Sequence, residues 1–346
     1  MDGVVPTDAG DVPRVRTALD ARDRLGTFKA RWGVGRMDCR VPPGLYAVGN
    51  PDAAATVLVS ANYKMSFDCL RAAMAGRDAW ILVLDTDGIN VWCAAGKGTF
   101  GTDELVRRVQ AVSLERVVSH RTLVVPQLGA PGVSAHEVKA RCGFRVSYGP
   151  VRAWDLPGFL DAGGKATLDM RRVRFPLRDR VALIPVELVM GAKVAFLLAL
   201  AVLLVGGLGP DGYSLGGLLG HGLPAAAILL GTFVAATVLG PTLLPWLPGR
   251  AFAVKGALLG VLLAAVAGAL SLGTGGQSWL HAAAWALLIP ALSSFVLMNF
   301  TGASTYTSLS GVLREMRVAL PVQGAVALIG FGLWVTGLFV SRGGPA

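Results

Sequence analysis

Cysteine and histidine are scarce in this chain, and neither clusters as metal ligands do. The 346 residues include four cysteines and four histidines, with no Cys-x-x-Cys pair and no His/Cys spacing typical of zinc. Four isolated cysteines do not form a disulfide framework, so we expect a reducing compartment. These absences exclude a zinc finger, a disulfide-rich secreted domain and an iron–sulfur cluster ligated by this chain alone.

Charged residues are almost absent from the second half. Residues 181–346 contain six of the 32 Lys/Arg residues and three of the 22 Asp/Glu residues. Five apolar runs occupy this half, each close to the ~20 residues that cross a bilayer. No acidic residue or histidine lies in the middle of a run, which disfavours ion transport. The expected spans are Val186–Leu208, Leu223–Leu244, Ala251–Leu272, Ala282–Phe300 and Val318–Val340.

The distribution of arginine predicts how the chain lies in the membrane. Arg250 follows the second span, and Arg314 and Arg317 follow the fourth, whereas the other two connections hold no Lys or Arg. With five arginines before the first span, this bias predicts a multi-pass protein of the cytoplasmic (inner) membrane, with its front half in the cytoplasm and its C-terminus outside. The first 30 residues lack the apolar core of a signal peptide, which agrees with that placement. Anionic lipid explains the basic collar better than nucleic acid does, so we expect a lipid bilayer and no nucleic acid as partner. The collar consists of Arg171, Arg172, Arg174, Arg178 and Arg180.

Short apolar strands alternate with helical segments in residues 44–165. This alternation predicts an α/β domain with a mainly parallel sheet, in which ligands bind beyond the carboxyl ends of the strands. The expected strands are Val57–Ser60, Trp80–Leu84, Thr122–Val125 and Phe144–Tyr148, and the expected helices are Ser66–Ala75, Asp103–Val112 and Ser134–Arg141. The predicted domains are an N-terminal extension (1–43) with one amphipathic helix near 14–31, the α/β domain (44–165), a basic linker (166–185) and a five-helix transmembrane domain (186–340).

Two nucleotide-binding motifs are incomplete. The segment before Thr99 is similar to a phosphate-binding loop, but Val91 stands where the motif needs its first glycine and Gly98 where it needs Ser or Thr. The Gly33-x-Gly35 pair lacks the third glycine and the preceding strand of a dinucleotide fingerprint. Neither segment predicts a nucleotide site.

The segment Asn90–Lys97, NVWCAAGK, follows an expected strand and carries the strongest signal. Asn90 can cap a helix, and Cys93 then lies in the first turn, where the helix dipole favours a thiolate. A thiolate is a ligand for soft metal centres. The small residues Ala94, Ala95 and Gly96 leave a helix face nearly bare, so that something flat can lie against it. Spacing alone also allows the alternative of a small buried cysteine.

NVWCAAGK resembles the signature of the membrane-bound corrinoid protein of microbial mercury methylation, in which the cysteine is the lower axial ligand of cobalt. Gly44–Pro51, Val57–Tyr63 and Gly149–Ala153 resemble the corrinoid domain that this family shares with the large subunit of the corrinoid iron–sulfur protein. The resemblance covers about residues 40–165, and the apolar tail fits the same family. The Asp-x-His-x-x-Gly motif of other cobalamin proteins is absent.

The resemblance implies an α/β Rossmann-like corrinoid-binding domain followed by an all-α five-span transmembrane domain. It also implies a corrinoid-dependent methyltransferase that transfers a methyl group from cobalt to Hg(II), forming methylmercury. Cys93 is then both the catalytic residue and the ligand to the cobalt of a cobalamin-type corrinoid. The expected cofactor-binding residues are Ser60, Asn62, Tyr63, Asn90, Val91, Trp92, Cys93, Ala94, Gln127, Gly129, Gly132, Val151, Arg152 and Ala153.

The same resemblance implies two partners. One is a small ferredoxin-like protein with two 4Fe–4S clusters as electron donor, and the other is a methyl donor such as methyltetrahydrofolate, acting through a methyltransferase. Two alternatives stay open. A membrane corrinoid protein that carries a methyl cation to a thiol or nickel acceptor is disfavoured by the thiolate, which favours transfer as a carbanion. A membrane transporter with a soluble regulatory domain is disfavoured by the lack of ionisable residues within the spans.

Overall fold

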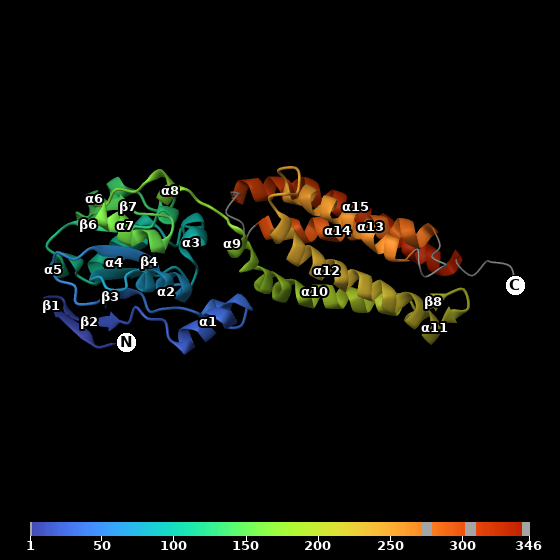
Figure 1. Ribbon diagram of the computed structural model, residues 1–346, viewed down its shortest axis with the longest axis horizontal. Coiled ribbons are helices and arrows are strands. Elements are labelled where there is room, and N and C mark those ends of the chain that lie inside the picture. The colour runs from blue at the N-terminus through green and yellow to red at the C-terminus, as the bar shows by residue number, and fades with distance from the viewer. Residues whose placement is uncertain (1, 272–278, 302–308, 341–346) are drawn as a thin grey trace. The chain divides into compact units, whose positions relative to one another are not determined.

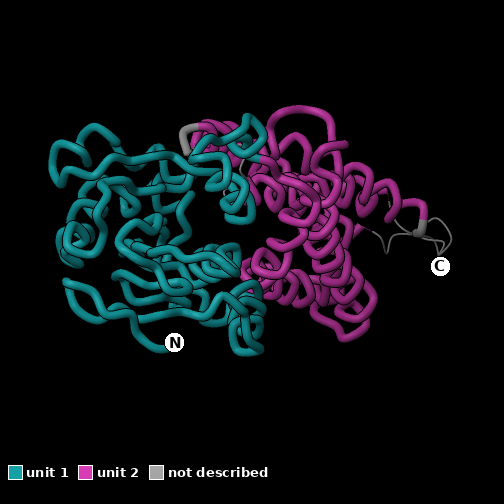
Figure 2. Tube along the Cα trace, turned by 60° about the vertical axis from the view of Figure 1, so that its left-hand side comes forward, with its two compact units in different colours: residues 1–173 teal, residues 174–346 magenta. Residues whose placement is uncertain are grey.

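The computed structural model describes residues 2–271, 279–301 and 309–340. The chain forms two compact units, residues 1–173 and residues 174–346, which are coloured separately in Figure 2. Unit 1 contains all seven strands of the main sheet, and unit 2 contains the long apolar helices (Figure 1).

Unit 1 is built on a mixed sheet with the strand order β1-β2-β3-β5-β4-β6-β7. Strands β5, β4, β6 and β7 are parallel, while β3 is antiparallel to β5. Strand β2 is parallel to β3 and antiparallel to β1. The predicted parallel strands thus form the centre and one edge of the sheet, and three further strands extend its other edge. The strands are β1 (Val4–Thr7), β2 (Gly10–Val15), β3 (Gly44–Val48), β4 (Val57–Ala61), β5 (Ala79–Leu84), β6 (Thr122–Val125) and β7 (Arg145–Tyr148).

Helices cover both faces of this sheet, as the unbroken apolar runs of its central strands require. Successive residues of β4 point to opposite faces. Val57 and Val59 pack in the same core cluster as residues of α3, α4 and α6, whereas Leu58 packs with residues of α2 and α7. The helices of unit 1 are α1 (Ala21–Arg31), α2 (Lys64–Ala73), α3 (Val91–Lys97), α4 (Thr102–Ala111), α5 (Leu114–Val117), α6 (Ala135–Cys142), α7 (Leu156–Asp161) and α8 (Leu168–Arg171), with short turns η1 (Arg36–Asp38), η2 (Gln127–Gly129) and η3 (Ala153–Asp155).

The first 43 residues belong to unit 1 and do not form a separate extension. Strand β2 pairs with β3 through Arg14–Ala47 and Val15–Val48, so the N-terminal hairpin widens the sheet. The helix expected near 14–31 is restricted to α1, which begins after the N-cap Asp20. The sequence hides the hairpin because β1 and β2 each contain a proline, a residue confined to edge strands and strand ends.

Within residues 2–271, 279–301 and 309–340, five helices of unit 2 are long and apolar enough to cross a membrane, as many as the predicted spans. Two of them are parts of longer helical segments: α10 belongs to Leu177–Val205, and α12 belongs to Leu215–Leu243. The elements are α9 (Leu177–Val181), α10 (Ile184–Val205), the hairpin β8 (Leu208–Gly209) and β9 (Gly212–Tyr213), α11 (Leu215–Gly217), η4 (Leu218–Gly222), α12 (Leu223–Leu243), α13 (Phe252–Ser271), α14 (Trp279–Phe300) and α15 (Leu309–Val340).

Glycine allows a close approach between two of these helices, α13 and α14. A Cβ atom at Gly256 would lie 2.5 Å from the backbone oxygen of Ser293, and one at Gly260 would lie 2.4 Å from Cα of Pro290. The α13 and α14 backbones therefore meet directly, as small residues permit in membranes.

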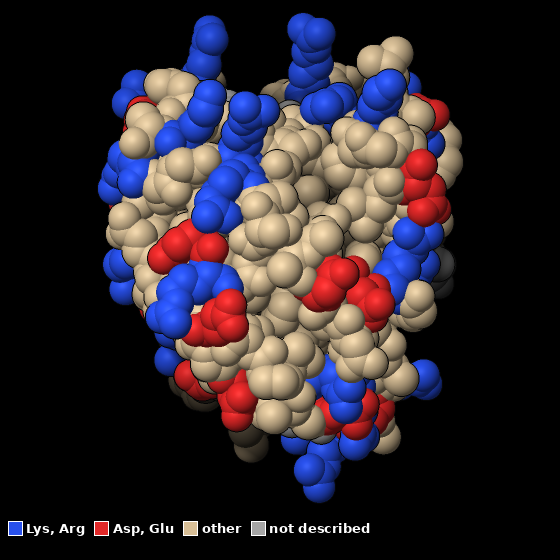
Figure 3. Space-filling model, turned by 90° about the vertical axis from the view of Figure 1, so that its left-hand side faces the viewer, with Lys and Arg blue, Asp and Glu red and all other residues tan. Residues whose placement is uncertain are grey.

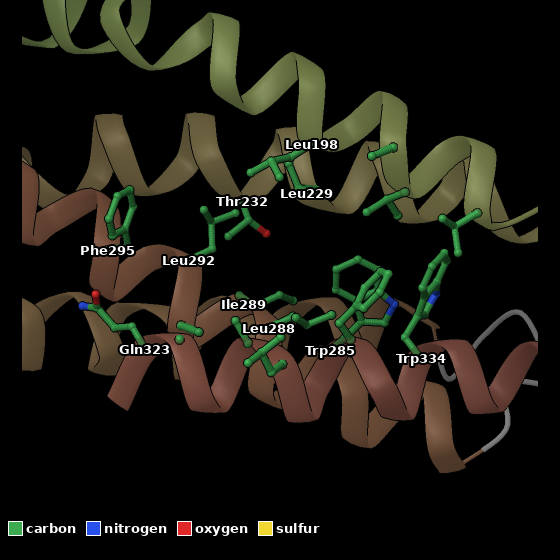
Figure 4. A pocket seen from close by; sticks show the side chains of 18 of the residues that line it. Leu198, Leu229, Thr232, Trp285, Leu288, Ile289, Leu292, Phe295, Gln323 and Trp334 are labelled. Atoms are coloured by element: carbon green, nitrogen blue, oxygen red, sulfur yellow. The ribbon is translucent and has the colours of Figure 1, made fainter. Parts of the chain in front are cut away.

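Helices α10, α12, α14 and α15 line an open cavity of about 660 Å³ (Figure 4). Its lining is almost wholly apolar and includes Trp285, Phe295 and Trp334, with Thr232 and Gln323 as its polar residues. This cavity offers no charged path for an ion.

Candidate functional site

The predicted site segments all follow the carboxyl ends of strands in the sheet. Strands β5, β4, β6 and β7 are parallel, so their carboxyl ends lie at the same edge. Asn62 and Tyr63 follow β4, Asp85–Asn90 follow β5, Gln127 follows β6 and Gly149–Ala153 follow β7. This is the edge at which α/β folds bind ligands.

Helix α3 holds Cys93 in its first turn. Asn90 has an extended backbone, and its side-chain Oδ1 accepts a hydrogen bond from the backbone N–H of Cys93 at 3.0 Å. Gly98 ends the helix in the left-handed conformation with φ of +86°. The predicted cap and the position of the cysteine are both confirmed. Cys93 is a free, partly buried thiol.

The small residues of α3 divide between two faces. Ala94 and Ala95 are 0% and 7% exposed and pack in the core, so the expectation that they clear space beside Cys93 is wrong. Their small size lets α3 lie close to the sheet. Gly96 is exposed and lies three residues after Cys93, on the same side of the helix. A Cβ atom at Gly96 would meet nothing within 4 Å. The open surface beside the thiol is therefore at Gly96.

Asn62 fixes the loop between β5 and α3. Its Oδ1 accepts hydrogen bonds from the backbone N–H groups of Thr86 and Gly88 at 3.1 and 2.9 Å, and from the Thr86 hydroxyl at 2.8 Å. Its Nδ2 donates to Asp85 Oδ1 at 3.1 Å. At 3% exposure Asn62 is buried, so its side chain shapes the loop that leads to Cys93.

Two further residues that fix this loop were not predicted from the sequence. The Thr86 hydroxyl lies 2.7 Å from the backbone oxygen of Ile89, an acceptor that shares the single hydroxyl proton with Asn62 Oδ1. Glu104 of α4 accepts a hydrogen bond from the backbone N–H of Asp85 at 2.8 Å. The sequence signal for a tight loop at this place was the Asp87–Gly88 dipeptide, because this pair is typical of tight turns. Both residues have positive φ in the structure.

Gly129 and Gly132 support α3 from behind. A Cβ atom at Gly129 would lie 2.4 Å from the ring of Phe100, and one at Gly132 would lie 2.1 Å from the Phe100 backbone oxygen. The same Cβ at Gly132 would lie 3.2 Å from Cα of Ala95. Both glycines were predicted to bind the cofactor, and neither position leaves room for a side chain beside Phe100.

The other predicted residues differ in accessibility. Ser60, Tyr63 and Val91 are 2%, 6% and 9% exposed. The Tyr63 hydroxyl donates to Met65 Sδ at 3.0 Å, and burial raises the pKa of Tyr63. The partly exposed residues are Trp92, Gln127, Val151, Arg152 and Ala153.

Two of the partly exposed side chains have neighbours that position them. Gln127 Oε1 accepts a hydrogen bond from Arg171 at 2.9 Å. The guanidinium of Arg152 lies 5.0 Å from the centre of the Trp154 ring, a cation–π distance. These side chains thus border the strand-end face from the β6 and β7 sides.

Cys93 is the soft donor of this face. Cys39, by contrast, is surrounded so that burial raises the pKa of its thiol, which disfavours a thiolate there. Among the residues that the structure describes, no three His, Cys, Asp or Glu side chains gather in a group able to hold a metal ion.

Known proteins match the part of the chain that contains this site. Residues 33–159 match the family model described as CO dehydrogenase/acetyl-CoA synthase delta subunit. The acetyl-CoA decarbonylase/synthase complex subunit gamma of Methanopyrus kandleri is 32% identical over 126 residues, which are 36% of this chain and 27% of that protein. The same subunit of Archaeoglobus fulgidus is 27% identical over 157 residues, 44% of this chain and 33% of that protein. That of Methanosarcina acetivorans is 29% identical over 130 residues, 36% of this chain and 27% of that protein.

The matched segments thus span a third or less of the length of these relatives. Residues 33–159 lie within unit 1 and include α3 and the four parallel strands. The matches support the relation of this segment to the corrinoid domain that the octapeptide and its neighbouring runs indicate.

Proposed function

We propose that unit 1 binds a cobalamin-type corrinoid at the carboxyl ends of its parallel strands and transfers a methyl group to Hg(II). The observation that carries this proposal is the geometry of α3. A free, accessible thiol stands on a capped first turn beside an open glycine surface. The segment that contains it is related to corrinoid proteins.

The residues present fit a flat corrinoid, which Cys93 would hold through its sulfur. Gly96 leaves the space beside the thiol free, and Cys93 is a donor suited to a soft metal centre. When bound, the corrinoid supplies the cobalt-carried methyl group. Gln127, Val151, Arg152 and Ala153 line the accessible rim. Ser60, Asn62, Gly129 and Gly132 act indirectly, by holding the backbone around α3.

Cys93 performs the central task of this chain. Its sulfur is partly exposed in the first turn of α3, where it can reach a ligand at this face. A thiolate donates more electron density than an imidazole does. With such a donor, the corrinoid would supply its methyl group as a carbanion equivalent, which suits Hg(II), a soft electrophile.

Two partners complete the proposed reaction. A small ferredoxin-like protein with two 4Fe–4S clusters supplies electrons, and a methyltetrahydrofolate-type donor supplies the methyl group through a methyltransferase. Both come from the family resemblance, and the chain's relatives are named as subunits of a complex, so partner proteins are expected.

The five apolar helices would hold unit 1 at the cytoplasmic membrane. Gly212 in the hairpin after α10 is predicted outside and Gly249 before α13 inside, because arginine lies beside the second site and not the first. Reporter fusions at these two glycines measure the orientation, and a cytoplasmic signal at Gly212 contradicts it.

The decisive experiment compares Cys93→Ala and Cys93→His in the full chain. Cys93→Ala should abolish methyl transfer to Hg(II), whereas Cys93→His should retain corrinoid but transfer more slowly, because imidazole is the weaker donor. Bound corrinoid and the single-turnover rate are measured separately, since one reports binding and the other chemistry. Cys39→Ala, Cys69→Ala and Cys142→Ala are the matched controls and should retain most activity. Wild-type methylation by Cys93→Ala contradicts the proposal.

A second function is favoured by the names of the relatives. Subunits of an acetyl-CoA decarbonylase/synthase complex support a corrinoid methyl carrier that delivers a methyl cation to a thiol or nickel acceptor. The two functions separate when the methylated protein is offered Hg(II) or a thiol. Faster transfer to the thiol, unchanged in Cys93→Ala, favours the carrier.

A further inference from the structure

Helix α1 presents its large apolar side chains away from unit 1. Leu25, Phe28 and Trp32 are 52%, 59% and 39% exposed. Their spacing of three and four residues places them on one side of the helix, and the rings of Phe28 and Trp32 lie 6.1 Å apart. The three side chains form a stripe that the rest of unit 1 leaves uncovered.

The opposite side of α1 is the one attached to unit 1. Ala30 is 1% exposed. Asp23 forms ion pairs with Lys64 and Arg71 of α2, both at 2.6 Å. These contacts fix the rotation of α1 about its axis, so that the apolar stripe points away from unit 1.

Four cations border the apolar stripe on both sides. At about 100° per residue, Arg22 and Lys29 lie along one edge of the stripe, and Arg24 and Arg31 lie along the other. All four residues are exposed. Figure 3 shows another face of the molecule, where Lys and Arg gather along the upper edge and Asp and Glu lie among them lower down. An apolar face bordered by Lys and Arg is typical of helices that lie in a membrane interface.

The composition of the chain favours a membrane over a protein as the occupant of this surface. The five apolar helices of unit 2 would tether unit 1 beside a bilayer, and a tethered surface needs little intrinsic affinity to bind. Trp and Phe insert among headgroups, while the four cations match anionic lipids in sign.

We propose that α1 lies on the membrane surface, with Leu25, Phe28 and Trp32 inserted among lipid headgroups and the four bordering cations on anionic lipids. This contact would give unit 1 a second attachment besides the tether, and so fix which side of it faces the cytoplasm. The proposal goes beyond the proposed function and does not depend on corrinoid binding.

The test uses the full chain in lipid nanodiscs, with Phe28→p-benzoylphenylalanine as a photo-crosslinker. Lys139→p-benzoylphenylalanine, at an exposed position of α6, is the control. In discs with phosphatidylglycerol, lipid adducts at position 28 should exceed those at position 139 by about tenfold, since only the former inserts. Equal yields at the two positions overturn the proposal.

Charge reversal tests the electrostatic part. The quadruple variant Arg22→Glu, Arg24→Glu, Lys29→Glu, Arg31→Glu should reduce the lipid adduct at position 28 at least about fivefold. The matched control reverses four exposed cations elsewhere in unit 1, namely Arg116, Lys139, Arg145 and Lys165, and should leave the yield unchanged. An equal loss in both variants contradicts a specific contact. When a soluble two-cluster 4Fe–4S protein is added, transfer of the crosslink from lipid to that protein would identify α1 as a protein interface and overturn the proposal.

Discussion

Gly96 gives a test of the site that separates cofactor binding from folding. It is exposed within α3, and a Cβ atom there would meet nothing within 4 Å. Because alanine favours a helix by about 1 kcal/mol over glycine, Gly96→Ala should stabilise unit 1 slightly. Gly96→Leu should also fold, since its side chain projects into open space.

Gly96→Leu should weaken corrinoid binding, because the leucine side chain would occupy the surface beside Cys93. Overpacking a fitted contact costs about 1–3 kcal/mol, which corresponds to about fivefold to about 150-fold in affinity. Titration of the full chain in detergent with cobalamin, followed by visible absorption, measures the dissociation constant. Urea unfolding of the same variants measures stability.

The matched control is Gly26→Leu in α1, where a Cβ atom also meets nothing within 4 Å. It adds the same side chain to a helix away from the thiol and should leave the dissociation constant unchanged. Wild-type affinity in Gly96→Leu would mean that no ligand covers this face of α3, and the placement of the corrinoid would then be refuted.

Two other predictions concern the loops and the ion pairs of unit 1. Asn62→Ala removes the acceptor of three hydrogen bonds, so we expect a loss of about 3 kcal/mol in the free energy of unfolding. Cys93 should also be alkylated faster, which is measured in a variant whose other cysteines are alanine. Unchanged stability contradicts the role of Asn62. Burial opposes ionisation of Asp23, but hydrogen bonds from Lys64 and Arg71 outweigh it and lower its pKa from 3.8 to about 2. Because the folded state has the lower pKa, Asp23 stabilises unit 1 fully above about pH 4, and this contribution is lost as the pH falls through about 2. In urea unfolding, Asp23→Asn should therefore lower the free energy of unfolding by about 2 kcal/mol at pH 7 and by little at pH 2. The control Asp161→Asn, in the exposed pair with Arg77, should have a much smaller effect. A pH-independent loss for Asp23→Asn contradicts the role assigned to this carboxylate.

Local signals predicted the parts of unit 1 that are specified by near neighbours in the sequence. The start of α3 follows from one cap residue and a strand before it, and Asn90 and Cys93 lie as expected. Strand β6 has the predicted bounds, because a short run of β-branched and leucine residues between polar turns has few alternatives. The five apolar helices were equally evident, since about twenty apolar residues in succession are typical of a helix that crosses a bilayer.

Features that depend on tertiary contacts were not predictable in the same way. The small residues after Cys93 look alike in the sequence, and only the position of α3 against the sheet assigns Ala94 and Ala95 to the core and Gly96 to the surface. The N-terminal hairpin joins the sheet through β3, more than 30 residues later in the chain, so no local pattern specifies that pairing. Glu104 likewise reaches the site from a different helix.

These contacts imply that the thiol is placed before any ligand arrives. The loop before α3 is fixed by Asn62, which follows β4, and by Glu104 of α4. Gly129 and Gly132 allow close packing against Phe100, which follows α3. A site whose backbone is already ordered loses little conformational entropy on binding. Substituting Cys93 therefore removes a donor from an intact surface, whereas substituting Asn62 moves the surface itself. The first variant should change the chemistry of the bound corrinoid while preserving the fold of α3, and the second should change both, so hydrogen exchange of the α3 amides distinguishes the two roles.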